Sequence, residues 1–300
     1  MKVFVTGATG YIGSAVALRL KKAGHDVLAL VRSKEKGAAL QAAGVKLVAG
    51  ELGSPASYAA GAYGSAAVVH CAQEQSERSV ELDRKTVQSA RDLLRGQVGA
   101  TFIYTSGCWV AGETGDAAAD EATPVKPLAI AAWRPAHEQL ALEMEKDGIR
   151  AVVVRPGIVY GGKGGITGML FGSAAKQGAA QLIGEGANHW PMVHLDDLAE
   201  LYVRLVERAP AGSVFNAVNA SQHTQRELGE AASKAAGKGG AVSVLPIEKA
   251  RAQLGPFADA LAADQRLSSE KARNELDWRP RHEDFCGEAE ALFTAWQAAQ

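Results

Sequence analysis

The sequence predicts an α/β protein in which a parallel sheet is wound in both directions from its first strand. Over the first 160 residues, short apolar runs of strand length alternate with amphipathic stretches of helical period. A glycine cluster stands directly behind the first run, where a strand would turn into a helix. The chain has 300 residues, which is enough for one such domain and a smaller partner. These observations predict a doubly wound sheet with a smaller C-terminal α/β lobe.

The glycine cluster, Thr6-Gly7-Ala8-Thr9-Gly10-Tyr11-Ile12-Gly13, follows the apolar run Val3-Phe4-Val5. Gly7 would permit a tight turn, Gly10 a close approach to a ligand, and Gly13 the packing of helix on strand. Backbone N–H groups at a helix N-terminus bind anions such as a pyrophosphate, so the cluster predicts a dinucleotide site. The loop residues expected at this site are Gly7, Thr9, Gly10, Tyr11, Ile12 and Gly13.

The second predicted strand, residues 26–31, ends at Arg32, Ser33 and Lys34. A site for NAD usually places Asp or Glu at this point to bind the ribose 2′-hydroxyl. A guanidinium instead fits a 2′-phosphate through charge-assisted bonds, whereas a carboxylate would repel it. Arg32, with Ser33 beside it, therefore favours NADP over NAD. The alternative is that Arg32 is a solvated charge at a strand end.

Further buried strands are predicted over residues 45–49, 66–70, 101–104, 152–155 and 213–217, and a long amphipathic helix over residues 74–95. The carboxyl ends of parallel strands meet at one edge of the sheet, where ligands bind. Gly7, Arg32, Glu51 and Ala72 would converge at that edge.

Five further segments carry patterns in a fixed order. They are Gly50-Glu51-Leu52, Val69-His70-Cys71-Ala72, Ile103-Tyr104-Thr105-Ser106-Gly107, Arg155-Pro156-Gly157-Ile158-Val159-Tyr160-Gly161 and Val193-His194-Leu195-Asp196-Asp197-Leu198-Ala199. With the glycine loop, they make the chain resemble an extended or atypical short-chain dehydrogenase/reductase of the NAD-dependent epimerase/dehydratase-like family. The resemblance implies a Rossmann-type fold, and it adds Glu51, Leu52, Cys71, Ala72, Thr105 and Pro156 to the expected cofactor-binding residues.

The resemblance also implies a catalytic Ser or Thr after the fifth strand and a Tyr-x-x-x-Lys pair on the next helix. In that chemistry the hydroxyl holds the substrate carbonyl, the Tyr moves a proton, and the Lys binds the nicotinamide ribose and lowers the pKa of the Tyr. Ser106 is the candidate hydroxyl. The alternative is that Ser106 satisfies local backbone groups at a strand end.

The Tyr-x-x-x-Lys pair is missing. Counting back from Arg155 places the Tyr position at Ile130 and the Lys position at Arg134, and a shift of three residues gives Trp133 and His137. Neither alignment supplies a tyrosine. Arg134 can keep the ribose-binding role, because it is cationic and offers several donors. A surface arginine is an equal alternative.

Other residues are candidates for the missing proton transfer. Tyr160 is expected near the nicotinamide end of the cofactor, Tyr104 precedes the active loop, and His137 titrates in the range suited to acid–base catalysis. Cys108 is a further candidate as a nucleophile, although an inert small side chain is the simpler interpretation. A bound water is the remaining alternative.

Composition excludes several classes of function. A formal net charge of −1 argues against a nucleic-acid-binding surface. Three widely spaced cysteines are typical of reduced thiols in a cytoplasmic protein rather than of disulfides or a metal site. The apolar runs are short and the N-terminus enters a strand at once, so neither a membrane span nor a signal peptide is expected. A homodimer is one expected assembly.

Residues 1–160, joined by about 193–220, are expected to form the Rossmann-type domain, and residues 161–192 and 221–300 the smaller substrate-binding lobe. The predicted function is an NADP-dependent oxidoreductase acting on a small carbonyl compound, with Ser106, Arg134 and Tyr160 as catalytic candidates. The missing tyrosine leaves two alternatives. One is a catalytically silent NADP-binding redox sensor or regulatory protein, and the other is a sugar-type epimerase or dehydratase.

Overall fold

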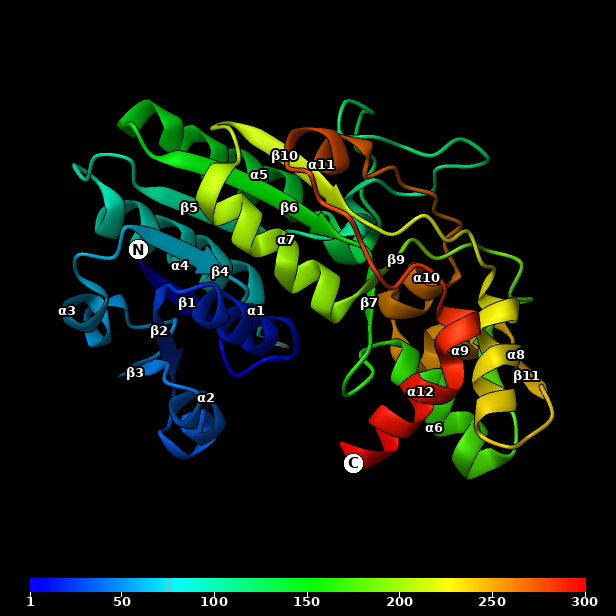
Figure 1. The fold of residues 1–300 in the computed structure, drawn as a ribbon. Helices are drawn as coiled ribbons and strands as arrows, with labels where there is room; N and C mark the ends of the chain where they lie inside the picture. The colour runs from blue at the N-terminus through cyan, green and yellow to red at the C-terminus, as the bar shows by residue number, and fades with distance from the viewer. Residues whose placement is uncertain (75) are drawn as a thin grey trace.

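A parallel sheet of seven strands forms the centre of the molecule (Figure 1). The computed structural model describes residues 1–74 and 76–300. The strand order is β10-β6-β5-β4-β1-β2-β3. The strands are β1 (Lys2–Thr6), β2 (Asp26–Val31), β3 (Lys46–Ala49), β4 (Ala67–His70), β5 (Thr101–Thr105), β6 (Arg150–Pro156) and β10 (Ser213–Ala217). Most of them are short Val-, Leu- and Ala-rich runs buried on both faces, as parallel sheets require.

The direction of winding reverses at β1, which pairs with β2 on one side and with β4 on the other. The chain first builds outward to β3 and then crosses back to build β4, β5, β6 and β10. Crossover connections leave to opposite faces on the two sides of this point, so the carboxyl ends of β1 and β4 open a crevice. Sheets of this kind bind their ligands there.

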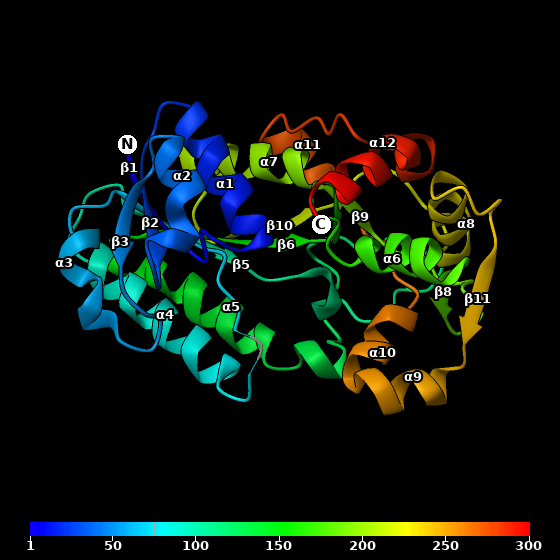
Figure 2. The same ribbon diagram turned by 90° about the horizontal axis from the view of Figure 1, so that it is seen from below.

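Helices cover both faces of the sheet, which Figure 2 shows nearly edge-on. One face carries α1 (Tyr11–Lys22), α2 (Ala38–Ala42) and α7 (Leu195–Arg208), and the other carries α3 (Ala59–Ala62), α4 (Ser79–Leu94) and α5 (Arg134–Leu142). Each layer packs its own cluster of buried apolar side chains against the strands. Apolar positions at helical spacing, such as Val16 and Leu20 on α1, bury one face of each helix.

A second group of elements packs around its own aromatic cluster, which includes Phe171, Phe285, Phe293 and Trp296. Its elements are α6 (Thr167–Gln177), β8 (Ala180–Ile183), α8 (Gln225–Ala235), β11 (Val242–Leu245), α9 (Ile247–Leu254), α10 (Pro256–Ala262) and α12 (Phe285–Ala298). Two short strands, β7 (Ile158–Tyr160) and β9 (Met192–His194), pair where the chain passes between the sheet and this group.

The predicted fold class is confirmed, with differences in detail. The helix expected over residues 74–95 begins at Ser79, and Gln75 lies outside the described residues. Helix α11 (Glu270–Glu275) and the segment behind it belong to the cluster of the sheet, not to the smaller lobe, because Trp278 packs there and donates its indole N–H to the carbonyl of Asp197 at 2.9 Å. The two-part division at the expected boundaries remains a proposal.

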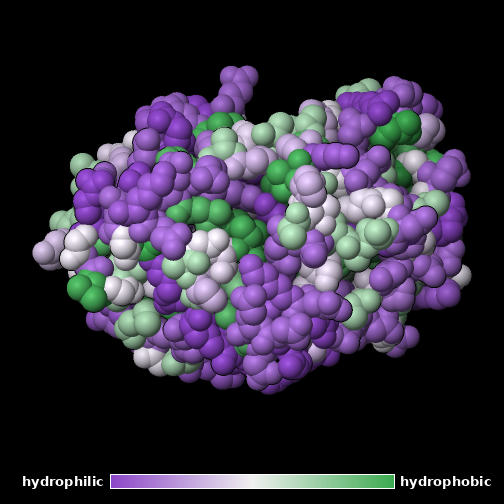
Figure 3. Space-filling view, turned by 90° about the horizontal axis from the view of Figure 1, so that it is seen from above, coloured by the Kyte–Doolittle hydropathy of each residue, from purple (hydrophilic) through white to green (hydrophobic). Residues whose placement is uncertain are grey.

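Figure 3 shows one face on which apolar residues form small, separate areas among polar ones. Across the described residues, no helix combines the length and the apolar character that a membrane crossing demands.

Candidate functional site

A cleft of about 780 Å³ opens at the carboxyl ends of β1, β2 and β4. Its wall is built from the glycine loop and from the residues that follow each strand. The predicted residues that line it are Gly7, Thr9, Gly10, Tyr11, Ile12, Arg32, Glu51, Leu52, Cys71 and Ala72. We call it the dinucleotide cleft.

Two glycines of the loop cannot be replaced without moving backbone. Gly7 has a φ of +70°, and a Cβ there would lie 2.5 Å from the backbone of Ala72, just beyond the end of β4. A Cβ on Gly13 would overlap the carbonyl of Gly7. Gly13 was expected at the cofactor site, but it does not line the cleft. Its lack of a side chain instead lets α1 pack closely under the glycine loop, which is the second role predicted for it.

The N-terminus of α1 faces this cleft without a cap. Gly10 is the N-cap residue, no side chain bonds to the first backbone N–H groups, and no acidic residue lies in the first turn. These N–H groups have no intrahelical partners, and they carry the positive end of the helix dipole. The loop and helix thus fit the pyrophosphate of a dinucleotide.

The far wall of the cleft holds more charge than the sequence suggested. Arg32 is joined there by Lys36 and Arg78, which local patterns did not single out, and the carboxylates of Glu51 and Glu74 also line it. Arg78 comes from the segment before α4, so only the fold brings it near Arg32. Ser33 was expected here but does not line the cleft.

A smaller pocket of about 260 Å³ adjoins the dinucleotide cleft, and Tyr11, Ile12 and Gln73 line both. We call it the Ser106 pocket. Ser106 is 6% exposed, and its Oγ has no hydrogen-bond partner within the described part of the chain. A buried hydroxyl without a partner is uncommon, because it costs roughly 1–3 kcal/mol of desolvation. This hydroxyl is therefore available to a ligand rather than satisfied by local backbone.

Arg134 also lines the Ser106 pocket, from the first position of α5. Its guanidinium donates to the carbonyl of Thr105 at 3.1 Å and to the side-chain oxygen of Gln73 at 3.0 Å, and it stacks on Trp133. Within the described part of the chain, the other three of its five N–H donors have no partner. Ile130 lines the same pocket, whereas His137 points into the core, so the geometry favours the alignment with Ile130 at the tyrosine position.

Tyr160 does not serve this pocket, which corrects its assignment as a catalytic candidate. Its side chain is fully buried in the aromatic cluster of the smaller lobe, edge-on to Phe285. The phenol donates to the carbonyl of His282 at 2.9 Å and accepts from the amide of Asn219 at 3.3 Å. Burial raises its pKa well above the ordinary value, and nearby carboxylates raise it further.

The other proposed proton donors lie in a buried network beneath α5. The carboxylate of Asp83 accepts hydrogen bonds from Tyr104 at 3.0 Å and pairs with His137 at 2.7 Å and His70 at 3.3 Å. Burial alone would raise the pKa of Asp83, but these bonds hold it far below its ordinary value. Tyr104 and His137 are thus committed to fixing α4, α5 and the sheet together.

The thiols near the site are poor nucleophiles. Cys71 lines the dinucleotide cleft and Cys108 the Ser106 pocket. Burial raises the pKa of Cys71 to about 11 and that of Cys108 to about 12. Thr105, expected to bind the cofactor, lines neither cavity, because its hydroxyl is bonded to the hydroxyl of Tyr202 at 2.6 Å. Pro156 lines the Ser106 pocket.

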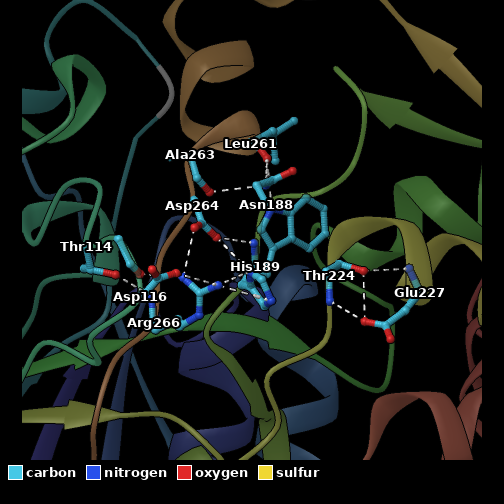
Figure 4. A network of polar contacts seen from close by, with 12 residues as sticks. Thr114, Asp116, Asn188, His189, Thr224, Glu227, Leu261, Ala263, Asp264 and Arg266 are labelled. Atoms are coloured by element: carbon cyan, nitrogen blue, oxygen red, sulfur yellow. Dashed lines mark hydrogen bonds and ion pairs between the residues drawn. The ribbon is translucent and has the colours of Figure 1, made fainter.

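A polar network from the smaller lobe braces the loop behind this pocket (Figure 4). Asp264 pairs with His189 at 2.8 Å and with Arg266 at 2.9 Å, and the backbone N–H of Arg266 donates to the hydroxyl of Thr114 at 2.7 Å. Between them, the buried amide of Gln265 donates to the carbonyls of Cys108 and Gly112. The contact spans about 150 residues of sequence, so local patterns could not have shown it.

The fold also gathers two groups of side chains of the metal-ligating types, although no metal-binding spacing was expected. They are His194 with Asp196 and His282, and His223 with Asp284 and Cys286. Both groups have structural roles, since His194 caps α7 and Asp284 caps α12. Neither lines the dinucleotide cleft or the Ser106 pocket.

Comparison with known proteins gives the family. The NAD dependent epimerase/dehydratase family matches residues 3–219. A protein of Schizosaccharomyces pombe is 32% identical over 94% of this chain and 96% of its own length. A 4-hydroxy-2-methyl-3-oxo-4-farnesyl-3,4-dihydroquinoline-1-oxide ketoreductase of Stigmatella aurantiaca is 26% identical over 94% of this chain and 92% of its own.

Among solved structures, the UDP-glucose 4-epimerase of Thermus thermophilus in complex with NAD is similar over 100% of both chains, with a TM-score of 0.82. Its sequence is 22% identical, so this likeness concerns the fold alone. The family match covers most of the chain, and the wound sheet and the glycine loop agree with it. The chain belongs to the NAD dependent epimerase/dehydratase family.

Proposed function

We propose that this chain is an NADP(H)-dependent oxidoreductase that reduces a small carbonyl compound. The observation that carries the proposal is the free, buried hydroxyl of Ser106 in a pocket continuous with the dinucleotide cleft. Among relatives, the Stigmatella aurantiaca protein is named a ketoreductase, which supports the same reaction class.

The preference for NADP rests on the cations at the end of β2. Arg32 and Lys36 line the cleft together with Arg78, and a guanidinium suits a 2′-phosphate through charge-assisted bonds. The structurally similar epimerase carries NAD, so the affinities of this chain for NADPH and NADH are the direct test of the preference.

Two residues of the pocket have separate proposed roles in carbonyl reduction. The cofactor supplies the hydride, and the protein orients the substrate toward it and stabilises charge electrostatically. Ser106 donates a hydrogen bond to the substrate oxygen, where negative charge develops in the transition state. Arg134 holds the nicotinamide ribose with its unused donors and adds positive potential. We assign to a water at Ser106 the proton that the substrate oxygen takes up. Tyr11 carries the one phenol among the described residues of the pocket wall, and this phenol already donates to the carbonyl of Gly161 at 2.6 Å.

A second candidate is a catalytically silent NADP-binding sensor or regulatory protein. It is favoured by Ile130 at the position of the family tyrosine and by the burial of Tyr160, which leave no free phenol among the described pocket residues. A sugar-type epimerase or dehydratase would need the same phenol, so it is favoured less.

Turnover separates these candidates. We expect the chain to oxidise NADPH with some members of a panel of small aldehydes and ketones. Ser106→Ala should lower kcat/KM by roughly 10²–10³-fold, as removal of a single oxyanion donor does, and Arg134→Ala should raise the KM for NADPH. Tyr63→Ala is a control, since Tyr63 is 77% exposed and lines neither cavity. Tight NADPH binding without turnover across the panel would instead support the silent protein.

A further inference from the structure

The walls of the Ser106 pocket suggest which substrates fit. Beside Ser106, the wall consists mainly of apolar side chains from distant segments. They are Ile12, Trp109, Ile130, Pro156, Ile158, Val159 and Ile166. Arg134 is the one charged residue among the described residues that line it. Apolar walls with a few polar groups are typical of sites that bind mostly apolar ligands and orient them by one hydrogen bond.

The charge of Arg134 is partly offset by its surroundings. Its guanidinium bonds two neutral oxygens, and it interacts with the buried carboxylate of Asp83 beneath α5. A sugar nucleotide carries a diphosphate, which needs several cations or backbone donors to replace its hydration. The described wall of the Ser106 pocket offers no second cation, so it is poorly suited to hold a diphosphate.

The size of the pocket also favours a small ligand. Its volume of about 260 Å³ lies below the roughly 300–1,000 Å³ of pockets for drug-sized ligands. A nicotinamide entering from the dinucleotide cleft past Tyr11 and Ile12 would take part of that space. What remains is suited to a single ring or a short chain.

Trp109 is the largest side chain on this wall, and it is held in place. It lies on the turn Cys108–Val110 directly after Ser106, and its ring meets Phe257 of α10 edge-on at 5.7 Å between centroids. Gln265 fixes the same turn from behind by bonding the carbonyls of Cys108 and Gly112, at 3.1 and 2.7 Å. A rigid aromatic wall beside the substrate oxygen is suited to select flat, apolar ligands.

We infer that the Ser106 pocket admits a small, uncharged, mainly apolar carbonyl compound and excludes sugar nucleotides, with Trp109 as the residue that sets this specificity. The inference rests on the proposed function for the identity of the reaction. It concerns which ligand enters the pocket, so it can be tested by binding as well as by turnover.

The binding experiment uses the full chain saturated with NADP⁺. Benzamide is the probe, because it has the shape and the carbonyl of an aromatic aldehyde but is not readily reduced, and UDP-glucose is the competitor. We expect calorimetry to detect benzamide binding and no UDP-glucose binding, and Trp109→Ala to weaken benzamide about tenfold or more. Trp109→Phe should retain most of the affinity, and Tyr63→Ala should match the unmodified chain. Equal benzamide affinity in Trp109→Ala, or displacement of benzamide by UDP-glucose, would overturn the inference.

Turnover distinguishes this failure from that of the proposed function. With NADPH, benzaldehyde should be reduced with a kcat/KM at least about tenfold above that for glyceraldehyde, and Trp109→Ala should remove this difference. If neither aldehyde is reduced while benzamide still binds through Trp109, the proposed reaction is wrong and the pocket specificity stands. A preference for glyceraldehyde would contradict the specificity and leave the reductase proposal intact.

Discussion

The dinucleotide cleft and the Ser106 pocket differ in what they are made of. The dinucleotide cleft is built largely from backbone: a glycine loop, an uncapped helix N-terminus and the ends of parallel strands. The Ser106 pocket is built mainly from side chains on α1, α5 and β7 and on the turns that follow β5 and precede α5. A backbone site keeps its form wherever the glycines are kept, whereas a side-chain site changes its chemistry with one substitution such as the isoleucine at position 130. A substitution in the Ser106 pocket can therefore alter catalysis without altering the dinucleotide cleft.

Breaking the scaffold of the Ser106 pocket should give the largest effect. Glu138 on α5 accepts two hydrogen bonds from the guanidinium of Arg155 on β6, at 3.0 and 2.6 Å, and both residues are buried. Glu138→Ala leaves a buried cation unpaired, so we expect it to lower the free energy of unfolding by about 3–5 kcal/mol. Urea unfolding followed by circular dichroism measures the loss.

The matched control is Glu143→Ala, which removes an exposed pair with Lys146 at 3.7 Å and should cost less than about 1 kcal/mol. Because α5 also carries Arg134, folded Glu138→Ala should weaken NADPH binding as well as lower turnover. An unfolding free energy equal to that of the control would show that the buried pair does not anchor α5.

The sequence predicted the dinucleotide cleft better than the Ser106 pocket. Alternating strands and helices and the spacing of Gly7, Gly10 and Gly13 are local patterns, and the fold they predict is confirmed. The side chains of the Ser106 pocket meet only through the fold. Gln265 lies about 150 residues from the carbonyls that it bonds, so no local pattern could place it.

Tyr160 failed as a candidate for a related reason. Its motif fixes its place in the chain, but the direction of its phenol depends on partners much later in the sequence, at Asn219 and His282. The same holds at the cofactor end for Arg78, whose approach to Arg32 depends on the segment that precedes α4. Features set by the backbone, such as the strands and the glycine loop, could be predicted from the sequence. The directions of side chains whose partners lie far away in the chain could not.

A smaller effect is expected at the ribose end of the dinucleotide cleft. Arg32→Ala removes the side chain proposed to bind the 2′-phosphate, so the Kd for NADPH should rise about tenfold, while that for NADH changes less than about twofold. Titration of protein fluorescence with each cofactor measures both values. Lys34→Ala is the control, since Lys34 is exposed and does not line the cleft. Equal losses for the two cofactors would mean that Arg32 does not distinguish NADP from NAD.

The smallest effects on stability compare two hydroxyls, one from each kind of environment. Tyr160→Phe removes a phenol that donates to His282 and accepts from Asn219, so it should cost about 1 kcal/mol of unfolding free energy and leave kcat within about twofold. Ser106→Ala should have the opposite effects on stability and on turnover. Its Oγ has no partner to lose among the described residues, so stability should stay constant or rise slightly while turnover falls. Thermal unfolding and steady-state kinetics on both variants measure the contrast. A loss of turnover in Tyr160→Phe without a loss of stability would restore Tyr160 as a proton donor, because a purely structural phenol cannot change the rate without changing the fold.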